Sequence, residues 1–405
     1  MKALVLGGGS DQCSLIMELK QRGFTTILVD YYEQPPAKAL VDKHYRVSTL
    51  DQEAVCRIAE GEQVDRVVTA CIDQALLTVA YVSEKLGLYW PFSYEEALRA
   101  TNKAFMKQVF RDFDIPTANF IIADNEDDAL NHNLAYPVVV KPADSNGSFG
   151  VRRVNAITQL QPAIADALRI SRSRKAIIEE YVAGTELSID AFVYDQRVHL
   201  LLVTETRKIP SAEGVFPICQ SRYPVDLSEA VLLKIERAVK RIVTAFDLNN
   251  TPLLVQVVVR DAEVFVLEFG TRIAGGSKHH LIKHITGFDV MNAFVETLFQ
   301  GTVDVKTHPC AKHVTTNYIY TNPGVFCAVT GIDALLQDAI VVRFDRYKTP
   351  EMKIVSSSAS RDRIGAFIVE ADDRTMLQKK LDYADRNMKV LNEAGNDIML
   401  HGLFA

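Results

Sequence analysis

A lysine that follows three valines is the residue of this chain with the plainest chemical use. Lys141 comes directly after residues 138–140, and a turn rich in serine and glycine over residues 145–150 follows it. A buried ammonium group needs an anionic partner, and the backbone N–H groups of such a turn can approach an anion closely. The segment therefore predicts a cradle for a nucleotide polyphosphate. A strand that ends in a solvated lysine before an ordinary loop is the alternative.

Two further segments could complete the binding of a nucleotide. Lys103 opens a predicted helix and would add a second positive charge for the phosphates. The segment Glu179–Val182 ends a predicted strand, so its backbone could meet the edge of an adenine base while a carboxylate accepts from the amino group. Glu186 could accept hydrogen bonds from ribose hydroxyls. Taken singly, each of these residues could equally be a solvated charge on a helix or an edge strand.

Oxygen ligands for a metal ion, and a guanidinium group, come later in the chain. Gln256 and Glu268 lie on two predicted antiparallel strands, and Glu268 stands between two apolar residues, where a carboxylate needs a partner. Carboxylate and amide oxygens are ligands that Mg²⁺ accepts. Arg272 offers a planar fork suited to a phosphoryl or acyl-phosphate oxygen. The order of these residues along the chain favours a magnesium–nucleotide site.

The composition is that of a globular protein of two or three domains. The chain has 405 residues, 48% hydrophobic and 24% charged, and a net charge of −6, which argues against a dominant role in nucleic-acid binding. The N-terminus has no signal-peptide pattern, and no apolar run is long enough to span a membrane. The six cysteines are scattered without a C-x-x-C pair, which predicts reduced thiols in a cytoplasmic protein and disfavours a zinc site built from them.

Strands and helices alternate over the first hundred residues, which predicts a parallel, doubly wound sheet. The glycines 7–9 follow the first strand, and Asp30 ends the second, as in dinucleotide-binding turns. Gln12, however, stands where the third glycine of that motif belongs, so a turn that shapes a substrate pocket or only packs is the favoured alternative. Short elements from about residue 115 to 181 suggest a small α+β unit.

Three polar segments allow more than one interpretation. Thr204–Lys208 with Arg222 could bring cations to a substrate carboxylate, or could be a solvated loop. Residues 211–224 contain turn signals and are expected to form a loop. His280 and His284 have the spacing of a metal-binding pair, but without an acidic partner nearby in the sequence a helix that lines a cleft, or plain packing, is favoured.

With these motifs in this order, the chain resembles the ATP-grasp superfamily of ligases. The resemblance rests on Thr101-Asn102-Lys103, Val140-Lys141-Pro142 with residues 145–151, the segment Glu179–Glu186, and Glu268 to Arg272 with Gly275-Gly276. It implies a mixed α/β and α+β fold in three parts. These are a Rossmann-like preATP-grasp domain over residues 1–98, an ATP-grasp domain over 99–305 with a mobile lid at about 115–181, and a C-terminal α+β portion over 306–405.

The resemblance also implies a role for each candidate residue, with ATP and Mg²⁺ (or Mn²⁺) as cofactors. Lys103, Lys141, Ser145, Gly147, Ser148 and Gly150 would hold the phosphates; Glu179, Glu180, Tyr181 and Val182 would meet adenine; Glu186 would meet ribose; Gln256 and Glu268 would bind the metal; and Arg272 with Lys141 would be catalytic. One position departs from the superfamily's usual Glu-x-Asn-x-Arg. Gly270 stands where the asparagine metal ligand is expected, so the metal could be held differently or catalysis could be lost.

The implied activity is that of a carboxylate–amine ligase. The layout is most similar to amino-acid ligases and to biotin-carboxylase and carbamoyl-phosphate-synthetase domains. A carboxylate would be activated by ATP as an acylphosphate and coupled to an amine, with an amino acid as at least one substrate, and with release of ADP and phosphate. A bicarbonate-activating enzyme and a nucleotide-binding regulatory protein are the alternatives. Small-molecule substrates and a homodimer are expected as partners, and neither nucleic acid nor a membrane is.

Overall fold

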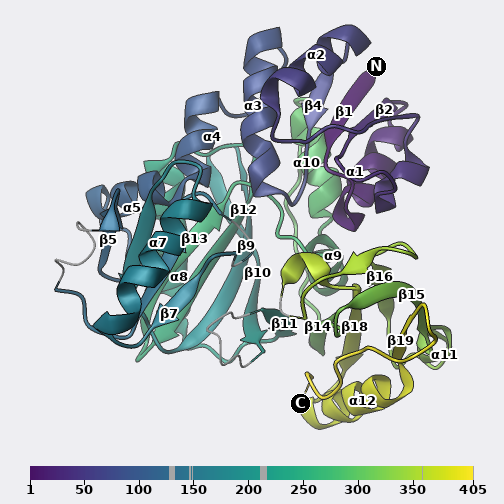
Figure 1. Cartoon of the computed structure of the whole chain (residues 1–405). Helices are drawn as coiled ribbons and strands as arrows, with labels where there is room; N and C mark the ends of the chain where they lie inside the picture. Colours follow the sequence, from purple (N-terminus) through teal and green to yellow (C-terminus); the bar gives the residue numbers. More distant parts are fainter. Residues whose placement is uncertain (127–132, 146, 148, 210–216, 358, 405) are drawn as a thin grey trace.

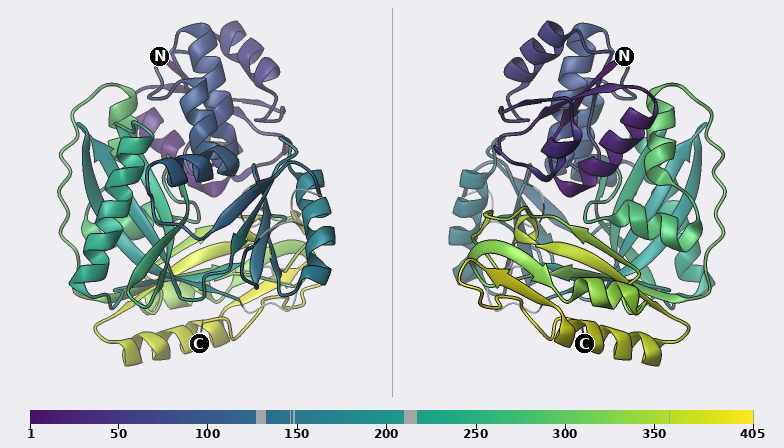
Figure 2. Two further views of the ribbon diagram at one scale, coloured as in Figure 1. Left: turned by 90° about the vertical axis from the view of Figure 1, so that its left-hand side faces the viewer. Right: turned by 90° about the vertical axis from the view of Figure 1, so that its right-hand side faces the viewer.

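The computed structural model describes residues 1–126, 133–145, 147, 149–209, 217–357 and 359–404. Helices accompany several sheets, which confirms the predicted mixed α/β class (Figure 1). The N-terminal part lies at one end of the molecule and the C-terminal helix at the other (Figure 2). Within the described residues, no helix is long and apolar enough to cross a membrane.

The N-terminal sheet is parallel, as predicted, with the strand order β3-β2-β1-β4. Its strands are β1 (Lys2–Leu6), β2 (Thr25–Val29), β3 (Lys43–Tyr45) and β4 (Arg66–Val68), and its helices are α1 (Ser10–Gln21), α2 (Gln52–Glu62) and α3 (Asp73–Leu86). Residues 3–6 and 26–29 are buried throughout, as strands covered on both faces require. Asp30 accepts a hydrogen bond of 2.7 Å from the N–H of Gly8, so its carboxylate fastens the glycine turn that precedes α1.

A small antiparallel sheet with its own core forms the part between residues 120 and 180. Its strands, in the order β5-β8-β6-β7, are β5 (Phe120–Ala123), β8 (Ala176–Glu180), β6 (Val138–Pro142) and β7 (Arg152–Val154). Helix α7 (Leu160–Ile170) packs on this sheet through Leu160 and Ile164, which contact the buried valines of β6. The sequence also predicts a helix over residues 127–131, and that segment lies outside the described residues.

The largest sheet runs through the middle of the molecule and continues into the C-terminal part. Its eight strands, in spatial order, are β13 (Glu263–Gly270), β12 (Thr251–Arg260), β9 (Thr185–Tyr194), β10 (Arg197–Lys208), β11 (Ile218–Tyr223), β14 (His313–Ile319), β18 (Gly365–Ala371) and β16 (Arg343–Arg346). Helices α8 (Glu229–Ala245), α9 (Lys278–Thr286) and α10 (Val290–Leu298) accompany it. The sheet contains strands from both sides of residue 306, so it is continuous across the predicted domain boundary. The boundary itself stays a prediction.

The expected loop at residues 211–224 is wrong for its second half. Residues 218–223 form β11, an interior strand that pairs antiparallel with both β10 and β14. Pro217 and Pro224 misled the prediction because they flank the strand and so remove none of its N–H donors. Residues 211–216 lie outside the described residues.

The remaining elements complete both ends of the molecule. Helices α4 (Tyr94–Thr101) and α5 (Lys103–Asp112) link the N-terminal sheet to the small one. A three-stranded sheet of β17 (Lys353–Ile354), β15 (Gly324–Thr330) and β19 (Lys389–Asn392) lies with α11 (Ile332–Gln337) and α12 (Arg374–Asn387) in the C-terminal part. The sequence reading had missed all three of these strands.

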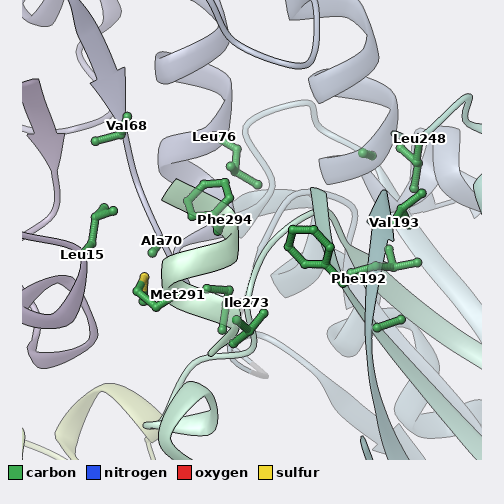
Figure 3. Packing of buried hydrophobic residues seen from close by; sticks show 14 of the residues in the cluster. Leu15, Val68, Ala70, Leu76, Phe192, Val193, Leu248, Ile273, Met291 and Phe294 are labelled. Atoms are coloured by element: carbon green, nitrogen blue, oxygen red, sulfur yellow. The ribbon is translucent and has the colours of Figure 1, made fainter. Parts of the chain in front are cut away.

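One hydrophobic core joins the N-terminal sheet to the central one. Phe294 of α10 lies between Leu76 of α3 and Met291, and Leu15 and Val68 of the N-terminal unit belong to the same core (Figure 3). Trp90 meets Phe294 edge to face, with ring centroids 6.2 Å apart. The N-terminal unit is therefore fixed against the sheet that carries β12 and β13, and its loops can take part in a site there.

Candidate nucleotide site and its surroundings

Three lysines and two carboxylates meet where α5, the small sheet and β13 come together. Lys103 and Lys107 lie one turn apart on α5, and Lys141, Glu179 and Glu268 lie near the ends of β6, β8 and β13. All but the half-buried Glu268 are more than nine-tenths buried. The set carries three positive and two negative charges, so it has a surplus positive charge to offer an anion.

Glu179 holds two of these lysines together. Its Oε1 accepts from the Nζ of Lys141 at 2.5 Å, and its Oε2 lies 2.7 Å from the Nζ of Lys107, though poorly aligned for a hydrogen bond. Burial alone would raise the pKa of Glu179, but the ammonium groups of Lys107 and Lys141 outweigh it and lower the pKa to about 2. This places Glu179 among the predicted phosphate-binding lysines.

Lys107 was not singled out in the sequence, although it follows Lys103 at the i,i+4 spacing of one helix face. Only 1% of it is exposed, and its Nζ also donates to the Oγ1 of Thr117 at 2.5 Å. Burial lowers its pKa to about 8, against the opposing effect of Glu179. The spacing within α5 was the signal that could have found it.

Lys103 ties the second carboxylate to the glycine-rich turn. Its Nζ lies 3.2 Å from Glu268 and donates to the carbonyl of Ser145 at 2.7 Å. Gln256 lies opposite Glu268 in the register of β12 and β13, so the two predicted metal ligands come together on neighbouring strands. Burial would raise the pKa of Glu268, but the ammonium groups of Lys103 and Lys141 lower it, which keeps the carboxylate in the ionised form that binds a cation.

The turn after β6 is compact around its small residues. The Oγ of Ser145 donates to the carbonyl of Phe149 at 2.8 Å, and Gly147 and Gly150 both have positive φ angles. A Cβ at Gly150 would lie 2.8 Å from Pro142 and Ile170, so only glycine fits there. Ser148 lies outside the described residues.

The predicted adenine and ribose contacts lie along the end of β8 and the start of β9. The carboxylate of Glu180 accepts from Asn119 at 2.9 Å and from the N–H of Ala135 at 3.0 Å. The N–H of Tyr181 donates to the carbonyl of Pro137, and Val182 is half-buried. Glu186 lies 2.5 Å from the Nζ of Lys208. Because the carboxylates of Glu180 and Glu186 have protein partners, the backbone of this segment is better placed to bind a base.

Arg272 pairs with a carboxylate of the N-terminal unit. Its Nε and Nη2 donate to the two carboxylate oxygens of Asp73, at the start of α3 in the N-terminal unit. Burial would lower the pKa of Arg272, but Asp73 outweighs it and raises the pKa above the usual value. Nothing in the sequence marked Asp73, because its partner lies 199 residues away.

The other candidate cations and histidines have partners of their own. Thr204–Lys208 belongs to β10, not to a solvated loop, and the Oγ1 of Thr204 accepts from the buried Lys278 at 2.5 Å. His280 and His284 lie on α9, as the favoured alternative expected. The Nε2 of His280 accepts from Arg343 at 2.6 Å, and that of His284 is 2.8 Å from Glu370. The two rings bind different partners and share no ligand position.

A cavity of about 290 Å³ lies between the N-terminal glycine turn and the C-terminal part. The first turn of α1 lines one wall, and the N-cap residue Gly9 makes no side-chain capping bond. Lys348, Arg361 and Arg363 line the opposite wall. The N-terminal end of α1 and these cations both favour an anionic ligand. The glycine turn is expected to shape a substrate pocket or only to pack, and Gly8 and Gly9 line this cavity.

Comparisons with known proteins agree with the architecture. Residues 134–279 match the ATP-grasp domain model. A formate-dependent phosphoribosylglycinamide formyltransferase of Ignicoccus hospitalis is 25% identical over 245 residues, which is 58% of this chain and 60% of that protein. The chain thus spans about 60% of the length of this curated relative.

Two solved structures share the fold over nearly the whole chain. An L-amino acid ligase from Bacillus licheniformis superposes with a TM-score of 0.81 at 19% identity, over 97% of this chain and 98% of that one. The biotin carboxylase domain of the 2-oxoglutarate carboxylase of Hydrogenobacter thermophilus, solved with MgADP, ADP and bicarbonate, superposes with a TM-score of 0.78 at 14% identity, over 96% and 90%. The domain match thus identifies an ATP-grasp domain over residues 134–279, and the chain as a whole shares the fold of these two structures.

Proposed function

We propose that this protein is an ATP-dependent carboxylate–amine ligase, which activates a carboxylate as an acylphosphate and couples it to an amine. The observation that carries the proposal is the cluster of Lys103, Lys107 and Lys141 around Glu179 and Glu268. Its surplus positive charge suits a polyphosphate, and Glu268 beside Gln256 offers the oxygen atoms that Mg²⁺ accepts. One structural neighbour is an L-amino acid ligase, and another was solved with MgADP.

Each group of this chain would then have a definite task. Lys103 and Lys141 would neutralise the phosphates, while Glu268 and Gln256 would hold the metal ion. Ser145, Gly147 and Gly150 would close over the phosphates, and the backbone of residues 180–182 would meet the base. Bound MgATP supplies the phosphoryl group. Arg272, whose guanidinium is fixed by Asp73, would stabilise charge on the transferring group.

The second substrate would bind in the cavity between the glycine turn and the C-terminal part. Lys348, Arg361 and Arg363 line it together with the start of α1, so an acidic group on the substrate is favoured. An amino-acid carboxylate fits that chemistry, and so does a sugar phosphate of the kind named for the Ignicoccus hospitalis relative. The proposed second substrate therefore carries either an amino-acid carboxylate or a sugar phosphate.

The test is ADP release with three sets of substrates. Amino-acid pairs, formate with phosphoribosylglycinamide, and bicarbonate alone would be supplied to the full chain with MgATP. The proposal expects that ATP cleavage requires both a carboxylate and an amine. Cleavage with bicarbonate alone would identify the bicarbonate-activating alternative. Tight ATP binding that no substrate accelerates would instead identify a nucleotide-binding regulatory protein and overturn the proposal.

A further inference from the structure

Three potential metal ligands meet in the structure, from segments that are far apart in the sequence. Asp11 lies in the first turn of α1, Cys71 lies between β4 and α3, and His279 lies in the first turn of α9. One ligand atom from each lies within 4.8 Å of the other two. The first two come from the N-terminal unit and the third from the central part, so only the fold brings them together.

His279 is the member whose surroundings point to a missing partner. It is 5% exposed, and its Nε2 lies 2.9 Å from the Oγ of Ser14. Its Nδ1 faces Asp11 at 3.9 Å and has no hydrogen-bond partner among the described residues. When Ser14 accepts from Nε2–H, the lone pair of Nδ1 is turned into the cluster, which is the usual outer support of a metal-bound histidine.

Asp11 is held in place while it keeps capacity for a cation. Its two oxygens accept from the N–H groups of Ser277 and Gly276, at 2.8 and 3.0 Å. These bonds orient the carboxylate, and each oxygen retains a further lone pair. Asp11 is also one of the residues that line the 290 Å³ cavity, so one member of the cluster borders that space.

We propose that Asp11, Cys71 and His279 form a binding site for a divalent ion of the zinc class. Thiolate, imidazole and carboxylate together are a zinc ligand set, and three protein ligands leave a fourth position for water or substrate. Zinc bonds of about 2.0–2.3 Å would draw the ligand atoms together by about 1 Å from their present separation. Such an ion would link the N-terminal unit to α9.

The sequence argument against a cysteine-based zinc site concerned spacing, and spacing is uninformative here. The ligands stand at positions 11, 71 and 279, and no short motif joins them. The site is separate from the proposed magnesium ligands Gln256 and Glu268. A result on the zinc site therefore does not test nucleotide binding. The two proposals can be confirmed or overturned independently.

The experiment is a Co²⁺ titration of the full chain after treatment with a chelator. The near-ultraviolet thiolate-to-cobalt charge-transfer band reports binding, and Zn²⁺ should displace it. We expect one equivalent for the wild type, loss of the band in Cys71→Ser, and affinity at least about 10–100-fold weaker in His279→Gln, since even outer ligands cost that much. Cys13→Ser and His280→Gln are the matched controls and should behave as the wild type.

Two results would overturn the proposal. One is a wild-type chain, folded by circular dichroism, that shows no thiolate–cobalt band. The other is a Cys71→Ser variant that keeps the band, or a Cys13→Ser variant that loses it. If the Cys71 and His279 variants do not fold, the wild-type titration still decides, together with a rise of the melting temperature on adding Zn²⁺ to the stripped protein.

Discussion

Asp73 accepts hydrogen bonds from the guanidinium of Arg272 through both of its carboxylate oxygens. The pair connects the start of α3 to the segment that follows β13. Asp73, in the N-terminal unit, therefore controls the position of Arg272 in the proposed active centre. The same carboxylate explains the glycine at 270. A Cβ there would lie 2.9 Å from the Oδ1 of Asp73, so Asp73 fills the space that a side chain at 270 would need.

Removing Asp73 should therefore destabilise the protein well beyond the loss of a surface charge. Asp73→Ala leaves Arg272 as a mostly buried, unpaired cation, which costs about 3–5 kcal/mol in the free energy of unfolding. Urea unfolding of the variant and the wild type measures this difference. Glu236→Ala breaks the exposed i,i+4 pair with Lys240 and should cost less than about 1 kcal/mol. Equal losses in the two variants would contradict the role given to Asp73.

A side chain at position 270 should conflict with Asp73 and with nothing else nearby. Gly270→Ala is expected to cost about 1–3 kcal/mol, because the carboxylate must move away from Arg272 to admit the new methyl group. In the Asp73→Ala background the same substitution should cost much less. Gly275→Ala is the control, since the nearest atoms to its Cβ would lie 3.6 Å away, an ordinary contact distance. A double-mutant cycle by thermal unfolding measures the coupling, and a coupling near zero would show that the two positions are independent.

The fold and half of the site were open to prediction because their signals are local. Three features can be recognised from stretches of about twenty residues. They are the alternation of strands and helices over residues 1–87, the lysine before the small-residue turn, and the hairpin of β12 and β13. Lys141, Lys103, Glu179 and Glu268 could be proposed from such segments, and the structure brings these four together. Their roles with a nucleotide stay predictions.

What the sequence did not disclose depends on contacts between distant segments. Asp73 meets Arg272 across 199 residues, and His279 meets Asp11 across two structural units. No periodicity or spacing encodes such pairs. The strand β11 is hard to predict for a different reason, since the prolines at its two ends are typical of a loop.

Nucleotide binding should depend on Lys141 far more than on other lysines of the small sheet. Lys141→Met removes a buried ammonium next to Glu179 and should weaken ATP binding by about tenfold or more, equal to at least about 1.4 kcal/mol. Lys175→Met is the matched control, because Lys175 is partly exposed and pairs with Asp124 away from the cluster. Calorimetric titration with MgATP measures both. A Lys141 variant that binds ATP like the wild type would remove the main support for the proposed phosphate site.

Stability in acid should report the ion pairs of Glu179. Its folded pKa of about 2 lies below the ordinary 4.5 of an unfolded glutamate, so the folded state holds the carboxylate ionised where the unfolded state would protonate it. The stabilisation is complete above about pH 4.5 and is lost as the pH falls toward 2, by about 3 kcal/mol in total. Unfolding free energies from urea titrations at several pH values across that range should show this slope.

Two variants separate Glu179 from the other carboxylates that titrate in the same range. Glu179→Gln should be less stable at neutral pH, since Lys107 and Lys141 lose their common partner, and should lose about 3 kcal/mol less than the wild type between pH 4.5 and 2. Glu180→Gln leaves both lysines paired and should keep the wild-type slope. If Glu179→Gln keeps that slope as well, the acid sensitivity arises elsewhere, and Glu179 is not the carboxylate that holds the lysine cluster together.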